Sequence, residues 1–363
     1  MASDKRAMAT IRRIDSIDPI EGADRIEVAR VGGWNVVVGK GEYHAGDYAV
    51  YFEIDTFLPS DDERFAFLAP RGTRKMVWNG EEREGHVLRT AKMRGVYSQG
   101  LLMNPDLWDI DPDVLPTLCA KRIDLSKQVG VWEWYKPLPS SDFIGRYDQY
   151  VAPRTDAVRI QNVDRAIWDV VKKTDYFCSV KVDGTSTTML WDKRVNRFRG
   201  FSHNHEFDLT TSLGKVLHDC AEGQGILKFC EDHPMLTVQA ELCGPKIQSN
   251  RYALESPRLF VFSLWDVDKS RYLDPYVFSE LSESVTPKLD LDLYQFDNPS
   301  DFLAWVDGMR GNITRDRLDE GVVVHVVGNL RATQQEFNTL VDELGPQRQV
   351  KAISNKYLLK AKE

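Results

Sequence analysis

The sequence predicts an α+β protein: a small closed β-barrel, followed by a domain built on twisted antiparallel sheets with flanking helices. Three observations lead to this prediction. The chain has 363 residues, more than the ~100–200 that are usual for one domain. Its N-terminal third consists of short β-branched and aromatic runs between glycine turns, a spacing typical of small barrels. After about residue 150, strand and helix patterns do not alternate strictly, which disfavours a doubly wound sheet.

The first domain contains three clear strand patterns, Ile26–Val31, Trp34–Val38 and Tyr48–Ile54. A connector rich in proline and aspartate follows, with one short helix expected near Leu115–Lys121. These features place the first domain at residues 1–120, a linker at 121–148 and the second domain at 149–363.

In the second domain, apolar residues at helical spacing predict four helices, at 163–173, 211–220, 301–309 and 333–344. Between them lie five apolar and β-branched runs that predict strands, at 177–182, 186–191, 237–242, 259–267 and 321–327.

The composition excludes several classes of protein. Hydrophobic residues make up 42% and charged residues 28% of the chain, which is ordinary for a folded domain. No run approaches the ~18 apolar residues of a membrane span, and the N-terminus lacks the apolar segment of a secretory signal. Five cysteines without a CxxC pair indicate free thiols, and we expect a cytoplasmic protein. Because the net charge is −8, any nucleic acid must bind through local basic patches.

The sharpest chemical motif is Lys181-Val-Asp183-Gly184, at the end of an apolar strand pattern. Partial burial at such a turn can depress the pKa of a lysine from ~10.4 toward neutrality. A lysine must be deprotonated to act as a nucleophile, so this placement makes covalent catalysis possible. Alone, the motif is also compatible with a solvated lysine before a turn.

Four further blocks follow in order. Glu241 ends a strand pattern closed by Gly244, and Phe260 and Phe262 belong to an aromatic strand that ends at Asp266. Glu320 precedes a buried strand pattern, and Lys351 and Lys356 lie in a basic C-terminal segment. Taken singly, each is equally compatible with a structural role.

Together and in this order, the blocks resemble the covalent nucleotidyltransferase superfamily, which includes ATP-dependent DNA and RNA ligases and mRNA-capping guanylyltransferases. Lys181–Gly184 matches motif I, Glu241 motif III, Phe260–Asp266 motif IIIa, Glu320 with its valines motif IV, and Lys351 motif V. The resemblance covers residues 150–363.

Three features resemble the RNA ligases in particular. They are the extended motifs Glu241–Asn250 and Lys351–Lys360, and the segment Arg154–Asn162, which includes Arg159 and Gln161. No sequence for a C-terminal OB domain follows motif V. Ile14–Ile26 and Ser98–Met103 instead resemble an OB-type module in front, as in a nick-sealing RNA ligase branch.

The resemblance implies roles for these residues. Lys181 would attack ATP and carry AMP, and Lys351 would be the cation on the α-phosphate. Glu241 would accept from the ribose, and Phe262, or secondarily Phe260, would stack on adenine. Asp183, Glu320 and Asp266 would hold Mg²⁺ or Mn²⁺ through its waters. Arg159, Gln161 and Lys356 complete the expected nucleotide site.

Two departures from the family pattern stand out. His203 occupies the place of a usual arginine and cannot supply a permanent charge or a bidentate fork, so Arg199 is the candidate substitute. Ile353 occupies the place of a second motif V lysine, for which Lys356 is the candidate substitute.

The expected partner is RNA with 3′-OH and 5′-phosphate ends, in a nicked duplex, bound by a monomer that does not associate with membranes. Two segments of the first domain mix cations with aromatic residues, the composition used to bind phosphates and stack bases. They are Arg71–Trp78, with Arg74 and Lys75, and Arg89–Tyr97, with Lys92 and Arg94. Two alternatives stay open: a capping-type guanylyltransferase or DNA ligase, and a non-catalytic RNA-binding protein with an eroded transferase domain.

Overall fold

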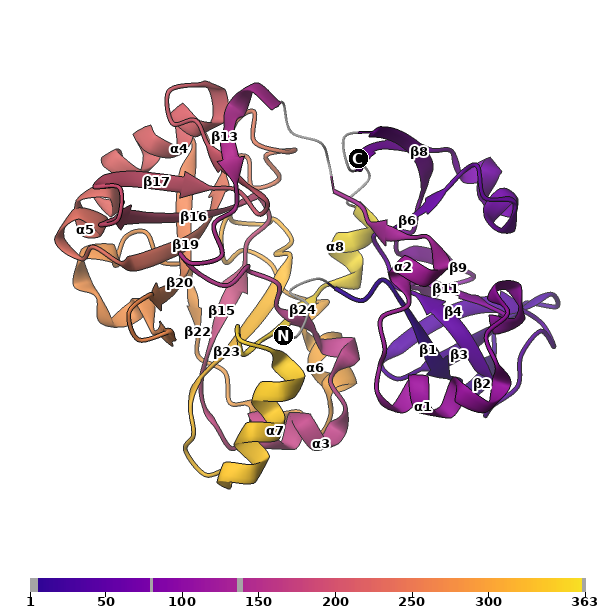
Figure 1. Cartoon of the computed structure of the whole chain (residues 1–363). Coiled ribbons are helices and arrows are strands. Elements are labelled where there is room, and N and C mark those ends of the chain that lie inside the picture. Colours follow the sequence, from indigo (N-terminus) through magenta and orange to yellow (C-terminus); the bar gives the residue numbers. More distant parts are fainter. Residues whose placement is uncertain (1–5, 79–80, 136–139, 361–363) are drawn as a thin grey trace. The chain divides into compact units, whose positions relative to one another are not determined.

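The chain forms two compact units, one made mainly of Lys5–Pro137 and the other mainly of Leu138–Tyr357. The computed structural model describes residues 6–78, 81–135 and 140–360 (Figure 1). Within these ranges, no helix combines the length and the apolar character needed to cross a membrane, and all five cysteines are free thiols.

Two three-stranded antiparallel sheets form the centre of the N-terminal unit. One has the order β1-β5-β11 and the other β2-β3-β4. Their inward side chains meet in one core that contains Trp34, Tyr51 and Leu102. The strands are β1 (Ala9–Arg13), β2 (Ser16–Pro19), β3 (Ile26–Val31), β4 (Trp34–Gly39), β5 (Tyr48–Phe52) and β11 (Leu101–Met103).

A four-stranded sheet, β12-β6-β8-β7, and the hairpin of β9 and β10 complete this unit. Residues 121–135, predicted as linker, differ from that expectation because they pack into the unit. Leu125, Val129 and Val131 are buried in its second core, and β12 pairs with β6. The elements are β6 (Thr56–Pro59), β7 (Arg74–Trp78), β8 (Glu81–Val87), β9 (Ala91–Met93), β10 (Val96–Ser98), α1 (Leu115–Ala120), α2 (Ser126–Val129) and β12 (Trp132–Glu133).

The C-terminal unit is built on two sheets. The seven-stranded sheet has the order β13-β18-β17-β16-β19-β20-β21, and the five-stranded sheet has the order β14-β24-β23-β15-β22. All pairs are antiparallel except β14 with β24. The strands are β13 (Phe143–Arg146), β14 (Val158–Arg159), β15 (Asp175–Lys181), β16 (Thr185–Asp192), β17 (Arg197–Phe201), β18 (His205–Phe207), β19 (Leu236–Cys243), β20 (Arg258–Asp266), β21 (Arg271–Leu273), β22 (Lys288–Leu289), β23 (Gly321–Gly328) and β24 (Gln349–Ile353).

Helices cover one face of each sheet, which leaves the other faces available for a site. Helices α4 and α5 lie along the seven-stranded sheet, and α3, α6 and α7 along the five-stranded one (Figure 1). Apolar residues of each set of helices share a core with the strands of that sheet. The helices are α3 (Arg165–Val171), α4 (Ser212–Gly223), α5 (Ile226–Asp232), α6 (Pro299–Val306), α7 (Gln334–Leu344) and α8 (Asn355–Lys360).

The predicted α+β class and its main elements are confirmed, with ends that shift by a few residues. Helix α7 begins within one residue of its predicted start, because Thr333 and Glu336 form a reciprocal capping box there. The expectation did not include β17, β18 and α5. Buried charged residues, Arg199 and Glu206, interrupt the apolar pattern of the two strands, and polar residues occupy exposed positions of the short helix.

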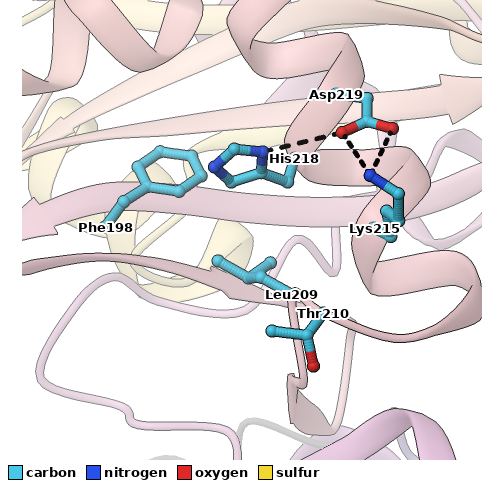
Figure 2. Close-up of a pocket in the computed structure, with 6 residues that line it drawn as sticks. All are labelled: Phe198, Leu209, Thr210, Lys215, His218 and Asp219. Carbon is cyan, nitrogen blue, oxygen red and sulfur yellow. Dashed lines mark hydrogen bonds and ion pairs between the residues drawn. The ribbon is translucent and has the colours of Figure 1, made fainter.

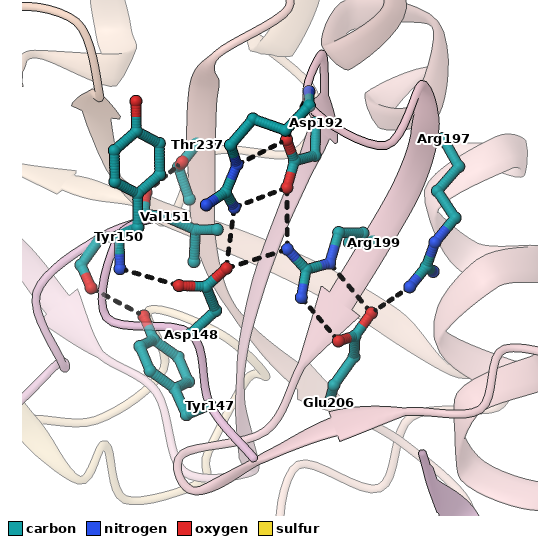
Figure 3. A network of polar contacts seen from close by, with 11 residues as sticks. Tyr147, Asp148, Tyr150, Val151, Asp192, Arg197, Arg199, Glu206 and Thr237 are labelled. Atoms are coloured by element: carbon teal, nitrogen blue, oxygen red, sulfur yellow. Dashed lines mark hydrogen bonds and ion pairs between the residues drawn. The ribbon is translucent and has the colours of Figure 1, made fainter. Parts of the chain in front are cut away.

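A largely buried network of charges links β16, β17 and β18 within the seven-stranded sheet (Figure 3). Arg199 donates to both oxygens of Glu206, at 2.9 and 2.6 Å, and to Asp192 at 2.7 Å and Asp148 at 3.0 Å. Burial raises the pKa of Asp192, but hydrogen bonds from Arg194 and Arg199 lower it to about 2. The resulting stabilisation is present above the ordinary aspartate pKa of ~3.9 and is lost as the pH falls through the lowered value.

Replacing Arg199 with Met should destabilise the protein strongly, because it leaves Glu206 and the fully buried Asp192 without their shared cation. The expected loss is about 3–5 kcal/mol in the free energy of unfolding, measured by urea denaturation of the whole chain at neutral pH. Lys215→Met is the control: Lys215 pairs with Asp219 at the surface, so less than about 1 kcal/mol is expected. Equal effects of the two substitutions would contradict a stabilising role for the network.

Candidate functional site

Lys181 ends strand β15, and strand register brings an acid beside it. In the antiparallel pair of β15 and β23, Lys181 lies opposite Gly321, so the preceding residue, Glu320, reaches the lysine amine. The Nζ of Lys181 lies 2.8 Å from a carboxylate oxygen of Glu320. Only 23% of the Lys181 side chain and 10% of the Glu320 side chain are exposed, so the pair is largely shielded from water.

Two glycines allow the strands to approach closely here. A Cβ added at Gly321 would lie 2.0 Å from the carbonyl oxygen of Ala352 in β24. A Cβ added at Gly184 would lie 2.4 Å from the carbonyl oxygen of Leu242 and 2.5 Å from the Sγ of Cys243. The glycines of the motifs therefore have a steric function, since no other residue fits without moving a strand.

Glu241 comes to the same place from the seven-stranded sheet. It lies opposite Ser186 in the pairing of β16 with β19, and its Oε1 accepts a hydrogen bond of 3.0 Å from the Gly184 backbone N–H. Burial raises the pKa of Glu241 to about 8, although the nearby positive charge of Lys181 opposes this shift.

The expectation of a depressed lysine pKa is wrong for the protein without ligands. Burial lowers the pKa of Lys181, but the negative charges of Glu320, Glu241 and Asp183 together raise it above its ordinary value. The amine is therefore a cation in this state. Any chemistry that needs a neutral amine requires a change in the charges around it.

Lys181 lies in a cavity of about 270 Å³ that residues of both sheets line. This is close to the ~300 Å³ lower end of typical small-ligand sites. From the five-stranded sheet come Lys181, Ser179, Val323, Gln349 and Lys351, and from the seven-stranded sheet Ser186, Glu241 and Phe262. Further lining residues are Thr155, Ala157, Val180, Val182, Gly184, His203 and Thr286.

A β-bulge separates the two predicted stacking residues. The pairing of β19 with β20 shifts between Gln239 and Ala240, so Phe262 has no opposite residue. Phe262 is half-buried and lines the cavity, whereas Phe260 is buried against Val182 and Tyr252. With Val323 from the other sheet, Phe262 supplies apolar surface suited to a flat aromatic ligand.

Lys351 also reaches this cavity, opposite Val323 in β23. Its positive charge acts on Glu320, where it partly offsets the rise in pKa that burial causes. Arg159 lies beside Lys351 in the parallel pairing of β14 with β24, and Gln161 follows in a short 3₁₀ turn. Both side chains are buried but lie outside the set that lines the cavity.

Three residues that were not predicted hold Asp183. Tyr357 donates a hydrogen bond of 2.6 Å from its hydroxyl to the Asp183 carboxylate, and Arg251 forms an ion pair with the same carboxylate at 3.2 Å. The Asp183 N–H donates to the Tyr252 hydroxyl at 2.9 Å. Tyr357 lies within the C-terminal motif, and Arg251 and Tyr252 directly follow Asn250, so extending these motifs would have found them.

The predicted metal ligands come together only in part. Asp183 and Glu320 both act electrostatically on Lys181, and carboxylate oxygens are suitable ligands for Mg²⁺ or Mn²⁺. Asp266 is a wrong assignment: it lies opposite Leu236, five residues along β19 from Glu241, or about 16 Å at ~3.3 Å per residue. It pairs with Lys269 instead, at 3.4 Å.

Of the two suggested substitutes for missing family residues, Arg199 is wrong and Lys356 stays a prediction. Arg199 cannot stand in for an arginine at position 203, because its guanidinium is committed to the buried network of Glu206, Asp192 and Asp148. His203 itself lines the cavity, 3.6 Å from a carboxylate oxygen of Asp156. The Lys356 side chain is exposed and lies outside the lining residues of the cavity.

A second hollow, of about 530 Å³, lies beside helix α4 (Figure 2). Lys215 pairs there with Asp219 at 3.2 Å, one helical turn apart, and His218 lies 3.8 Å from the same acid. Phe198 and Leu209 provide apolar surface. None of the predicted site residues lines this hollow, so the cavity at Lys181 is the candidate active site.

The two basic segments of the N-terminal unit differ in their charges. In the first, Lys75 pairs with Glu82 at 2.7 Å, and the Trp78 side chain lies outside the described residues. In the second, Lys92 lies over the ring of Tyr97, 5.3 Å from its centroid, and Arg94 is exposed in the turn of the β9–β10 hairpin. The hairpin therefore keeps the better-defined combination of cations and an aromatic ring.

Comparisons with known proteins agree with this arrangement. Residues 8–105 match an OB-fold domain family, and residues 174–339 match the RNA ligase family. A search of curated protein sequences found no match.

Solved structures of the Naegleria gruberi RNA ligase are similar to the whole chain. A variant with AMP and Mn is 28% identical, with a TM-score of 0.78 over 98% of this chain and 99% of that one. Another variant, with ATP and Mn, has a TM-score of 0.76 at 28% identity and covers 97% of this chain and 98% of that one. A structure with PPi has a TM-score of 0.77 at the same identity, over 98% and 99% of the two chains.

Replacing Gly321 with Ala should disrupt the site, because the added methyl group would separate β23 from β24 and move Glu320 relative to Lys351. We expect a loss of about 3 kcal/mol or more in the free energy of unfolding, measured by urea denaturation. Gly223→Ala is the control, since no atom lies within 4 Å of the added Cβ at that helical position. It should change stability by less than about 1 kcal/mol. A stable Gly321→Ala protein would contradict the steric argument.

Proposed function

We propose that this chain, whose residues 174–339 match the RNA ligase family, forms a covalent lysyl-AMP from ATP and joins RNA ends at nicks in duplexes. One observation carries the proposal: Lys181, the lysine of the K-x-D-G motif, lies in a cavity between two sheets with Glu241, Phe262 and Lys351. The ATP, AMP and Mn complexes of the similar Naegleria ligase support the same nucleotide and a divalent metal.

In the first step, the neutral amine of Lys181 attacks the α-phosphorus of ATP and pyrophosphate leaves. Charge develops on phosphate oxygens, so positioning and electrostatics do most of the catalysis. Lys351 supplies a fixed cation for the α-phosphate. Phe262 and Val323 enclose the base, and Glu241 accepts from the ribose hydroxyls.

In the second step, the AMP moves from Lys181 to a 5′-phosphate on RNA. In the third step, an RNA 3′-OH attacks that activated phosphate and AMP leaves. Lys181 regains its proton when the AMP departs from it, and the acids around it then favour the charged amine.

A divalent cation, when bound through its waters at Asp183 and Glu320, would neutralise phosphate charge and favour the uncharged amine. The carboxylates fit such an ion, and Mg²⁺ in particular retains several waters. Arg159, beside Lys351, and Gln161 remain candidates for contacts to the nucleotide phosphates.

The RNA substrate is supported mainly by the family match and by the OB-fold match of residues 8–105. OB folds commonly bind nucleic acid by combining a basic surface with aromatic stacking. Lys92, Arg94 and Tyr97 in the β9–β10 hairpin provide that combination. We infer a cytoplasmic monomer, in line with its free thiols.

The alternatives have less support. The RNA ligase match and the ATP and AMP complexes of the similar ligase favour RNA joining over capping with GTP or DNA ligation. An eroded, non-catalytic domain is disfavoured because Lys181, Glu241, Glu320 and Lys351 lie in one charged cluster, with geometry suited to the chemistry.

Incubation with α-labelled ATP and Mg²⁺ or Mn²⁺ should label the wild-type protein covalently, whereas Lys181→Ala should be unlabelled. The amine is the attacking group, so a loss of at least about 10³-fold in labelling rate is expected. The measurement is label that remains on the protein in denaturing gels and is released by acid, as expected for a P–N bond, with Lys215→Ala as the control. Label from α-labelled GTP alone, or full labelling of Lys181→Ala, would contradict the proposed reaction.

The protein should seal an RNA nick with 3′-OH and 5′-phosphate ends in a duplex faster than it joins the same ends in single strands. The duplex holds the two ends together, which removes the entropic cost of finding them. Rates of strand joining on matched nicked and single-stranded RNAs test this, with a nick lacking the 5′-phosphate as the control. Equal or faster joining of single strands would remove nick sealing from the proposal.

A further inference from the structure

Asp183 already has a cation at the carboxylate where a metal would bind. The Nε of Arg251 lies 3.2 Å from its Oδ2, and the Tyr357 hydroxyl donates to that same oxygen at 2.6 Å. The Arg251 guanidinium also lies over the Tyr357 ring, 4.7 Å from its centroid. Both ends of the ion pair are largely shielded, with 19% of the Arg251 side chain and 23% of the Asp183 side chain exposed.

Even with all three acids ionised, the local charges are balanced when Arg251 is counted. The three acids of the cluster have three formal cations to offset them. The acids are Asp183, Glu241 and Glu320, and the cations are Lys181, Arg251 and Lys351. A divalent cation that arrived alone would therefore meet little net negative charge.

The protein alone also offers few side chains that could coordinate a metal ion here. Among residues 6–78, 81–135 and 140–360, no group of three or more His, Cys, Asp or Glu side chains is placed to hold a metal ion. A triphosphate would change both conditions, because it adds about four negative charges and several oxygen ligands.

We propose that the ion pair with Arg251 weakens metal binding at Asp183 in the nucleotide-free protein. The divalent metal therefore binds together with the nucleotide and not before it. This inference rests on the proposed function. Metal and nucleotide then bind with positive coupling, because each increases the affinity for the other by the same factor. Arg251 is a positioning residue in this scheme, and it acts through Asp183.

The shorter of the two contacts to Asp183, the hydrogen bond from Tyr357, does not by itself weaken metal binding in the absence of nucleotide. Tyr357 is neutral, so its hydrogen bond orients the carboxylate without offsetting its charge. Removing Arg251 removes a charge, whereas Tyr357→Phe removes only a hydrogen bond. The two variants therefore separate charge competition from orientation of the carboxylate.

Binding of Mn²⁺ to the full-length protein tests the proposal, measured from the free-ion signal in electron paramagnetic resonance. Without nucleotide, Arg251→Met should bind Mn²⁺ at least about tenfold more tightly than wild type, and Tyr357→Phe should not. The Met side chain retains apolar contact with the Tyr357 ring. Arg258→Met is the matched control, since Arg258 lies over the Phe260 ring at 5.1 Å and donates to the Glu283 carbonyl. It should match wild type.

A second comparison adds nucleotide, and its result for the wild-type protein does not depend on any variant folding. A non-reactive ATP analogue should tighten Mn²⁺ binding by wild type at least about tenfold. The analogue should tighten binding by Arg251→Met by a smaller factor. Equal Mn²⁺ affinity of wild type with and without the analogue would overturn the proposal, as would an unchanged affinity in a folded Arg251→Met protein.

Adduct formation and Mn²⁺ binding together separate the role of Arg251 from the proposed reaction. If wild type forms a covalent AMP adduct but Mn²⁺ binding is uncoupled from the analogue, only the role of Arg251 is rejected. If no adduct forms with ATP and either metal, the proposed function itself fails, whatever the Mn²⁺ affinities are.

Discussion

The site depends on the contact between Lys181 and Glu320 across the antiparallel pair of β15 and β23. Its 2.8 Å distance follows from strand register, and the register in turn depends on Gly321, where any side chain would meet the neighbouring strand. A one-residue slip would turn Lys181 toward the opposite face of the sheet and Glu320 away from it. The chemistry of the cavity therefore relies on backbone pairing as much as on the charged groups.

Much of the fold and part of the site could be predicted from sequence. Motif residues at the ends of apolar strands, such as Lys181, Glu241 and Glu320, do converge, because adjacent strand ends meet at one place. Asp266 was placed wrongly because the motif does not reveal that β20 runs away from the site. The bulge that separates Phe262 from Phe260 arises from pairing with β19, which a single strand pattern does not show.

Charge state was the least predictable property. From sequence, burial of Lys181 suggested a lowered pKa, but three nearby carboxylates reverse the shift. Those contacts join segments that are far apart in the chain, as do the contacts of Arg251 and Tyr357 with Asp183. His203 lies in the cavity at the position where the family pattern has an arginine. Arg199 does not replace that arginine, because it pairs with Asp148, Asp192 and Glu206 in the buried network.

A crystal structure of the protein with Mg²⁺ and a non-reactive ATP analogue would show whether the cavity at Lys181 holds the nucleotide in a reactive orientation. We expect the base between Phe262 and Val323, the ribose at Glu241, and the α-phosphorus facing the Nζ of Lys181, with Lys351 beside it. A nucleotide bound in the hollow of Phe198 and Lys215, or one whose α-phosphate points away from Lys181, would contradict it.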